Sequence, residues 1–201
     1  MISNFDVSFS MTANMSTARK LFRLFKTFNE YVKIIAIRNG KLPDWEKHLQ
    51  IITRIAFAFY WIFDNLSVLI KVKFLDGYDL KAMARRASKA WLSGIILSII
   101  VALLELSKLS NRKSQLMLTK ANKSSTDNTK ETNEQFEADM KAIRASQTTQ
   151  KQTIVKMLGD SITASQSLGY PERFFGFNFS DGWVGVGGFT SAALSCYQTY
   201  K

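Results

Sequence analysis

Two stretches of this chain carry no charged side chain over a length close to the thickness of a bilayer. Residues 90–104 (AWLSGIILSIIVALL) give fifteen such positions, and residues 182–200 (GWVGVGGFTSAALSCYQTY) give nineteen. A helix of about 20 residues crosses the hydrocarbon core. The first stretch is long enough if Lys89 and Glu105 snorkel and residues 106–109 extend it. The alternative is a pair of buried helices in a soluble protein. We predict an all-α integral membrane protein with two membrane-embedded helices, at 90–109 and 182–200.

Both stretches place small residues at four-residue spacing, which puts them on one face of a helix. Small residues let helix backbones approach closely inside a membrane. The second stretch has two such faces, one with Gly188, Ala192 and Cys196 and one with Gly187, Ser191 and Ser195. We predict helix packing or self-association into a homo-oligomer through Gly94, Ser98, Ala102, Gly188 and Ala192.

A third feature is a basic amphipathic helix predicted over residues 17–38, with bases opposite an apolar stripe. Such a helix lies at a membrane interface, with rings below the headgroups and bases on anionic lipid. A surface helix of a soluble domain and a mitochondrial targeting helix are the alternatives, and Asp6 and Glu30 count against the second. Ile34 and Ile37 depart from the stripe. The predicted headgroup-binding residues are Arg19, Lys20, Arg23, Lys26 and Lys33, and the predicted inserting residues are Leu21, Phe22, Leu24, Phe25, Phe28, Val32 and Ile35.

The rest of the chain divides by composition. Residues 1–16 form a flexible N-terminus, and 17–89 an amphipathic helical region in which Pro43 opens a second helix. Arg54 and Asp64 leave only nine uncharged residues between them in that helix, so we expect it to pack on the first helix or lie at the interface. Residues 110–153 are predicted as a polar, partly disordered loop or a loose polar helix. Residues 154–201 hold a short helix and the C-terminal membrane segment.

The charge balance excludes several functions. The chain has 201 residues and a net charge of +11, which suits either nucleic acid or an anionic membrane. Almost all of the bases precede residue 158, and they match no nucleic-acid-binding motif, so we expect no nucleic-acid partner. One Cys and one His exclude an internal disulfide and a His/Cys metal cluster. We see no catalytic constellation, so we expect no cofactor and no enzyme activity.

Several segments resemble the peroxin eleven family of peroxisomal membrane proteins (peroxisomal biogenesis factor eleven). They are RKLFRLFKTFNEYVK, FAFYWIFDNLSVLIKVKFLD, AWLSGIILSII, LGDSITASQSLGY and FSDGWVGVGGFTSAALSCYQTY. The resemblance implies a protein of the peroxisomal membrane that promotes elongation, proliferation and fission of the organelle. It also implies that the helix matching 19–37 inserts into the cytosolic leaflet, and that the protein self-associates and recruits fission machinery.

A pore for small metabolites is the alternative function within that family, and a soluble helical adaptor is a third possibility. The basic flank of Lys81, Arg85, Arg86 and Lys89 ahead of the first membrane segment predicts a cytosolic N-terminus by the positive-inside rule. Two membrane segments then return the C-terminus to the cytosol.

Overall fold

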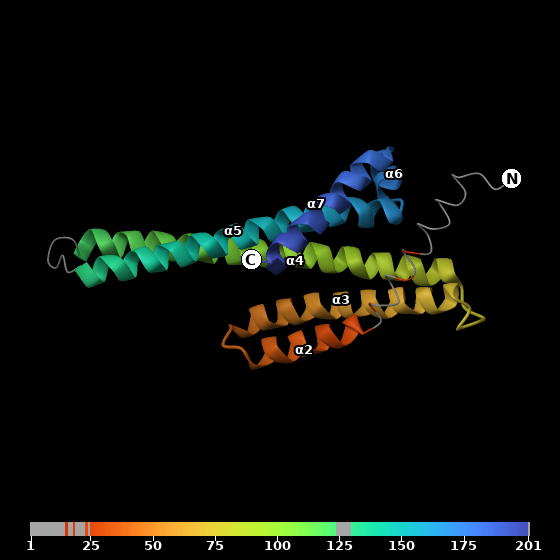
Figure 1. Cartoon of the computed structure of the whole chain (residues 1–201), viewed down its shortest axis with the longest axis horizontal. Helices are drawn as coiled ribbons and strands as arrows, with labels where there is room; N and C mark the ends of the chain where they lie inside the picture. The colour runs from red at the N-terminus through yellow and green to blue at the C-terminus, as the bar shows by residue number, and fades with distance from the viewer. Residues whose placement is uncertain (1–14, 16–17, 19–22, 24, 124–129, 201) are drawn as a thin grey trace. The chain divides into compact units, whose positions relative to one another are not determined.

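The computed structural model describes residues 25–123 and 130–200, together with residues 15, 18 and 23. Every element in this part of the chain is an α-helix, which confirms the all-α prediction (Figure 1). The helices are α2 (Lys26–Asn39), α3 (Asp44–Lys71), α4 (Leu80–Lys123), α5 (Lys130–Ser167), α6 (Tyr170–Phe175) and α7 (Asp181–Tyr200).

The helix ends follow local sequence signals. Pro43 stands directly before α3 with φ −56°, and Asp44 and Glu46 place negative charge in its first turn. Between α3 and α4 the chain turns through Gly77 at φ +83°, a conformation that glycine adopts without strain. The Asp79 carboxylate accepts a hydrogen bond from the Lys81 backbone N–H at 2.8 Å and caps the start of α4.

The chain divides into two compact units, one with residues 1–97 and 164–178 and the other with residues 98–163 and 179–201. In the first unit α2 packs antiparallel along α3 (Figure 1). α3 contacts α4 through the stacked rings of Tyr60 and Trp91, whose centroids lie 5.5 Å apart. Gly94 of α4 leaves room for the Phe57 ring, because a Cβ at Gly94 would lie 3.0 Å from that ring.

In the second unit the C-terminal part of α4 pairs with the N-terminal part of α5. The Lys120 ammonium lies 4.0 Å from the centre of the Phe136 ring and 4.0 Å from the Glu137 carboxylate. Further along α5, the helix meets α7 at Gly159 and Gly187.

Of the two alternatives for residues 110–153, a polar loop or a polar helix, the described residues form the helix. Residues 110–123 continue α4 and residues 130–153 belong to α5, so the short helix predicted near 154 is the end of a long one. Residues 124–129 lie outside the described part. Met140 and Ile143 are buried at helical spacing, which gives this polar helix a narrow apolar seam.

Within the described part of the chain, two helices are long and apolar enough to cross a membrane, and they are α3 and α4. Predicted segment 90–109 lies in α4, but segment 182–200 forms α7, which does not reach that hydropathy. Its glycines, hydroxyls and Gln198 lower the value although none of its side chains after Asp181 is charged. The sequence predicts that α3 packs on the first helix or lies at the interface, and α3 does pack on α2, where Arg54 pairs with Glu30. Its length and composition also suit a span, which counting the charges of Arg54 and Asp64 does not predict.

Candidate membrane-binding surface

The described part of α2 packs on α3 through a face that the apolar pattern of the sequence does not indicate. The residues at least partly buried on this helix and just before it are Arg23, Thr27, Glu30, Ile34 and Ile37. Their spacing of three or four residues defines one face of a helix. Ile34 and Ile37, which depart from the predicted stripe, are therefore the aliphatic residues that contact the rest of the unit.

The predicted inserting stripe lies on the opposite face and is exposed. Phe25 is 73%, Phe28 66% and Val32 63% exposed, and Ile35 and Tyr31 are exposed beside them. The Phe25 and Phe28 rings lie 6.3 Å apart and form one aromatic patch. A soluble helical domain buries such side chains. We call Phe25, Phe28, Tyr31, Val32 and Ile35 the outer face of α2. Leu21, Phe22 and Leu24 lie outside the described residues.

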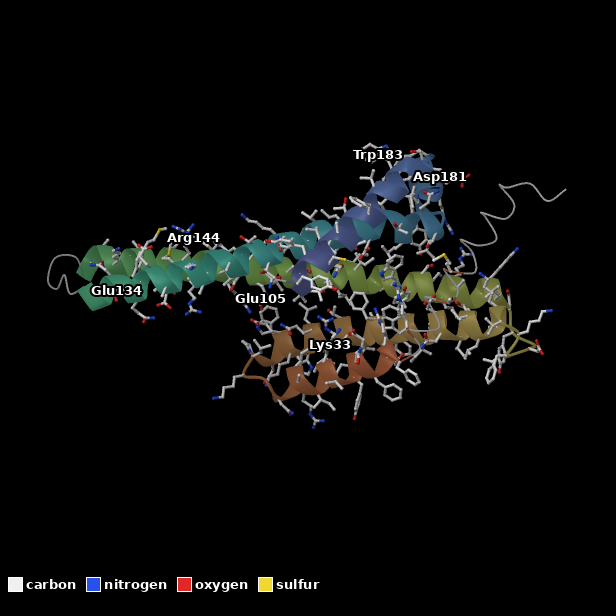
Figure 2. All side chains as sticks on the ribbon, viewed as in Figure 1. Lys33, Glu105, Glu134, Arg144, Asp181 and Trp183 are labelled. Atoms are coloured by element: carbon white, nitrogen blue, oxygen red, sulfur yellow. The ribbon has the colours of Figure 1, made fainter. Side chains whose placement is uncertain are left out.

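The predicted headgroup-binding bases line the side of α2 nearest α3. The Lys33 ammonium donates to the Glu30 carboxylate at 2.6 Å, and Figure 2 shows Lys33 on that side. The Lys26 ammonium lies 4.7 Å from the centre of the Trp61 ring. Arg23 is partly buried. Arg19 and Lys20 lie outside the described residues.

α3 is built with polar groups inside and apolar groups outside. Thr53, Asp64 and Ser67 are buried, and the Thr53 hydroxyl donates to the Leu49 carbonyl oxygen at 2.8 Å. The opposite face exposes a stripe at helical spacing, made of Ile52, Ile55, Phe59 and Ile62. Only 22% of the most apolar window of α3 is buried, and the same share holds for α4. A core helix of a soluble protein is mostly buried, so the length, composition and exposure of these two helices are compatible with contact with lipid.

The structure separates the predicted small residues into two groups. Gly94 and Ala102 are buried and Ser98 is partly buried, so Gly94 packs on Phe57 within the chain rather than on a second copy. Gly188 and Ala192 are exposed on α7, in line with exposed Cys196. The other small face of α7, with Gly187 and Ser191, is the one that packs on α5.

The contact between α5 and α7 contains an acid that sequence patterns do not single out. Burial raises the pKa of Asp160 above its ordinary value, although a hydrogen bond with Ser191 and the charge of Lys156 both act to lower it. Ser191 is itself buried. Asp160 immediately follows Gly159, so the close approach of the two backbones places its carboxylate against α7.

Comparison with known proteins gives a family. The sequence profile of the family "Peroxisomal biogenesis factor 11 (PEX11)" matches residues 6–200. A protein of Dictyostelium discoideum named "Peroxisomal membrane protein 11 homolog" is 29% identical over 210 residues, which cover 97% of this chain and 78% of that protein. No solved structure matches.

Proposed function

Because the chain belongs to the peroxisomal biogenesis factor 11 (PEX11) family, whose members are peroxisomal membrane proteins of organelle biogenesis, we propose that it shapes that membrane by inserting α2 into the cytosolic leaflet. The family is one of biogenesis factors rather than of enzymes. The observation that supports this proposal is that the outer face of α2 is apolar and exposed. An apolar helix face of this kind is stable in contact with lipid.

Transfer of the outer face of α2 from water into lipid lowers the free energy. Moving a large apolar side chain from water into hydrocarbon contributes about 1.5–3 kcal/mol, and the outer face offers several such side chains. A base near an anionic surface adds on the order of 1 kcal/mol. Lys33 already pairs with Glu30, so its share is smaller than that of an unpaired base.

The pairing of α2 with α3 supports an effect on one leaflet only. Lys26 reaches Trp61 and Glu30 reaches Arg54, so the described part of α2 lies along residues 44–61 of α3. α3 continues to Lys71 beyond that point. A bundle that is wider at one end of its span than at the other takes up more area in one leaflet, and that difference in area bends the membrane.

The test uses the full chain reconstituted in anionic liposomes, with tubules counted by electron microscopy. Replacing Phe25 and Phe28 together by Ser removes the aromatic patch, and we expect tubules to be lost while the protein stays in the vesicles. Asn29→Ser is the matched control, because Asn29 is exposed on the same helix and is polar already. Undiminished tubulation by the double variant would contradict the proposal.

We also propose the topology and the self-association predicted from the sequence. With the spans predicted at 90–109 and 182–200 and the basic flank at 81–89 in the cytosol, both termini lie in the cytosol, so a protease added to intact organelles should remove a tag at either end. Protection of either tag would contradict this arrangement. Recruitment of fission machinery and formation of a homo-oligomer remain part of the proposal through family resemblance.

A pore for small metabolites is the second candidate. The row of buried polar side chains on α3, Thr53, Asp64 and Ser67, favours it, because polar groups inside a membrane bundle often line a solute path. Efflux of a trapped small solute from the same vesicles separates the two functions. Efflux without tubulation would support the pore, and tubulation of vesicles that retain the solute would support membrane shaping.

A further inference from the structure

Glu30 is the acid of α2, and it lies at the centre of the face that packs on α3. It is only 5% exposed. One carboxylate oxygen accepts the hydrogen bond from Lys33, and the other lies 3.5 Å from the Arg54 guanidinium of α3. The oxygen that faces Arg54 is buried and accepts no hydrogen bond. Charge attraction is therefore what this oxygen contributes to the contact between the helices.

The orientation of α2 needs an explanation, because apolar burial alone favours a different one. A helix turned by half a turn would pack Phe28 and Val32 on α3 and expose Glu30 and Ile34. Before α2 enters lipid, removal of the larger apolar surface from water would favour that turned state. In the turned state Glu30 would lose Arg54, and Arg54 would lose its partner beside an apolar face.

We infer that the ion pair between Glu30 and Arg54 is a positioning contact that fixes the rotation of α2, so that its outer face points to lipid. This inference rests on the proposed function, in which α2 is the element that enters the leaflet. Buried ion pairs are best attested as devices that select one packing arrangement among several, rather than as sources of stability. The contact of Lys26 with Trp61 lies about one helical turn away and favours the same rotation.

The chain offers a direct way to measure this rotation. Its one cysteine is Cys196, so Cys196→Ser gives a cysteine-free background. A single cysteine is then placed at Val32→Cys on the outer face or at Ile34→Cys on the packing face. Each is labelled with an environment-sensitive fluorophore in the full chain, reconstituted in vesicles with spin-labelled lipids. Stronger lipid quenching at position 32 than at 34 reports the outward orientation.

Every charge variant also carries Lys33→Gln. This change keeps a lysine introduced at position 30 from lying beside the Lys33 ammonium. With Lys33→Gln alone we expect the quenching contrast to persist, because the pair with Arg54 remains. Glu30→Lys alone and Arg54→Glu alone should each remove the contrast and the tubules. The double variant Glu30→Lys with Arg54→Glu should restore both, which a loss of general stability would not do.

Two results would overturn the inference: single variants that keep the contrast, or a double variant that fails to regain it. These results differ from failure of the proposed function. If the contrast follows the charge pair while tubulation stays constant throughout, the positioning role stands and membrane shaping by α2 is wrong. If Phe25→Ser with Phe28→Ser abolishes tubulation but the charge variants leave the contrast intact, the function stands and the positioning role is wrong.

Discussion

Gly159 and Gly187 bring the backbones of α5 and α7 into direct contact. A Cβ at Gly159 would lie 2.6 Å from the Gly187 carbonyl oxygen, and a Cβ at Gly187 would lie 2.7 Å from the Gly159 carbonyl oxygen. Both distances are to backbone atoms, which cannot turn aside as a flexible side chain can. The two helices therefore need glycine at both positions to stay at this separation.

Gly159→Ala or Gly187→Ala should therefore force α5 and α7 apart, at a cost of about 1–3 kcal/mol. Thermal unfolding of the full chain in detergent measures the loss. Gly188→Ala is the matched control, because a Cβ at this neighbouring position meets nothing within 4 Å. Equal melting temperatures for Gly187→Ala and Gly188→Ala would show that this contact is not formed.

Asp160 should make the contact between α5 and α7 sensitive to pH. Burial raises the pKa of Asp160 in the folded chain above its ordinary value of 3.8. The folded state therefore holds the proton more tightly, so this stabilisation is complete below the unfolded pKa and is lost as pH rises through the folded pKa. We expect Asp160→Asn to melt higher than the native chain near neutral pH, with the difference vanishing in acid. A difference that is constant across pH would contradict this assignment.

The close packing of the Phe57 ring on Gly94 predicts that a second substitution can rescue the first. A side chain at Gly94 meets the Phe57 ring at 3.0 Å, so Gly94→Leu should separate α3 from α4 and lower the melting temperature. Phe57→Ala in the same chain makes room and should recover part of the loss. Ser93→Leu, at an exposed neighbouring position, should have little effect. If Phe57→Ala does not raise the melting temperature of the Gly94→Leu variant, the contact with Phe57 is not the cause of the loss.

Self-association should depend on the exposed small residues of α7. Gly188, Ala192 and Cys196 share one face, and Cys196 is exposed, so oxidation should crosslink two copies packed through this face. Gly188→Leu or Ala192→Leu should reduce the crosslinked dimer, because a bulky side chain holds the helices apart. Val186→Leu changes an exposed residue off this face and should leave crosslinking intact. Equal crosslinking in all three variants would remove this face from the interface.

Attraction to anionic lipid should weaken when the bases of α2 are neutralised. Arg23→Gln, Lys26→Gln and Lys33→Gln together should lower liposome binding at low salt, and the native chain should approach the variant as salt screens the charges. Co-sedimentation across a salt series measures both effects. The outer face is unchanged in this variant, so residual insertion should persist at all salt concentrations. If the difference in liposome binding between the native chain and the variant does not change with salt, these bases stabilise the fold rather than attract anionic lipid.

Hydrophobic pattern predicts the helices of this chain better than it predicts their orientation. The stripe of Phe25, Phe28 and Val32 identifies α2, but the same stripe suits packing on a core or contact with lipid. Glu30 decides between the two, and its role depends on Arg54, twenty-four positions later in the sequence. A pairing across helices leaves no periodic trace in either helix.

The polar segment 130–153 and helix α3 show, in the same way, that a sequence pattern does not reveal which side chains face another helix. Residues 130–153 look like a loop because their apolar residues are few, yet Met140 and Ile143 suffice for a seam when a second helix lies alongside. Arg54 and Asp64 make α3 look too short for a span if every charge is counted as facing lipid. Both side chains face protein, so their cost in a membrane is much smaller than their position in the sequence suggests.

The apolar exposed face of α3 also has a consequence for the biosynthesis of the protein. The stripe of Ile52, Ile55, Phe59 and Ile62 is compatible with lipid and incompatible with prolonged exposure to water. A newly synthesised chain that released this helix into the cytosol would associate with its own copies before it reached any bilayer. The exposed stripe therefore favours delivery of the new chain to a membrane without a long stay in water.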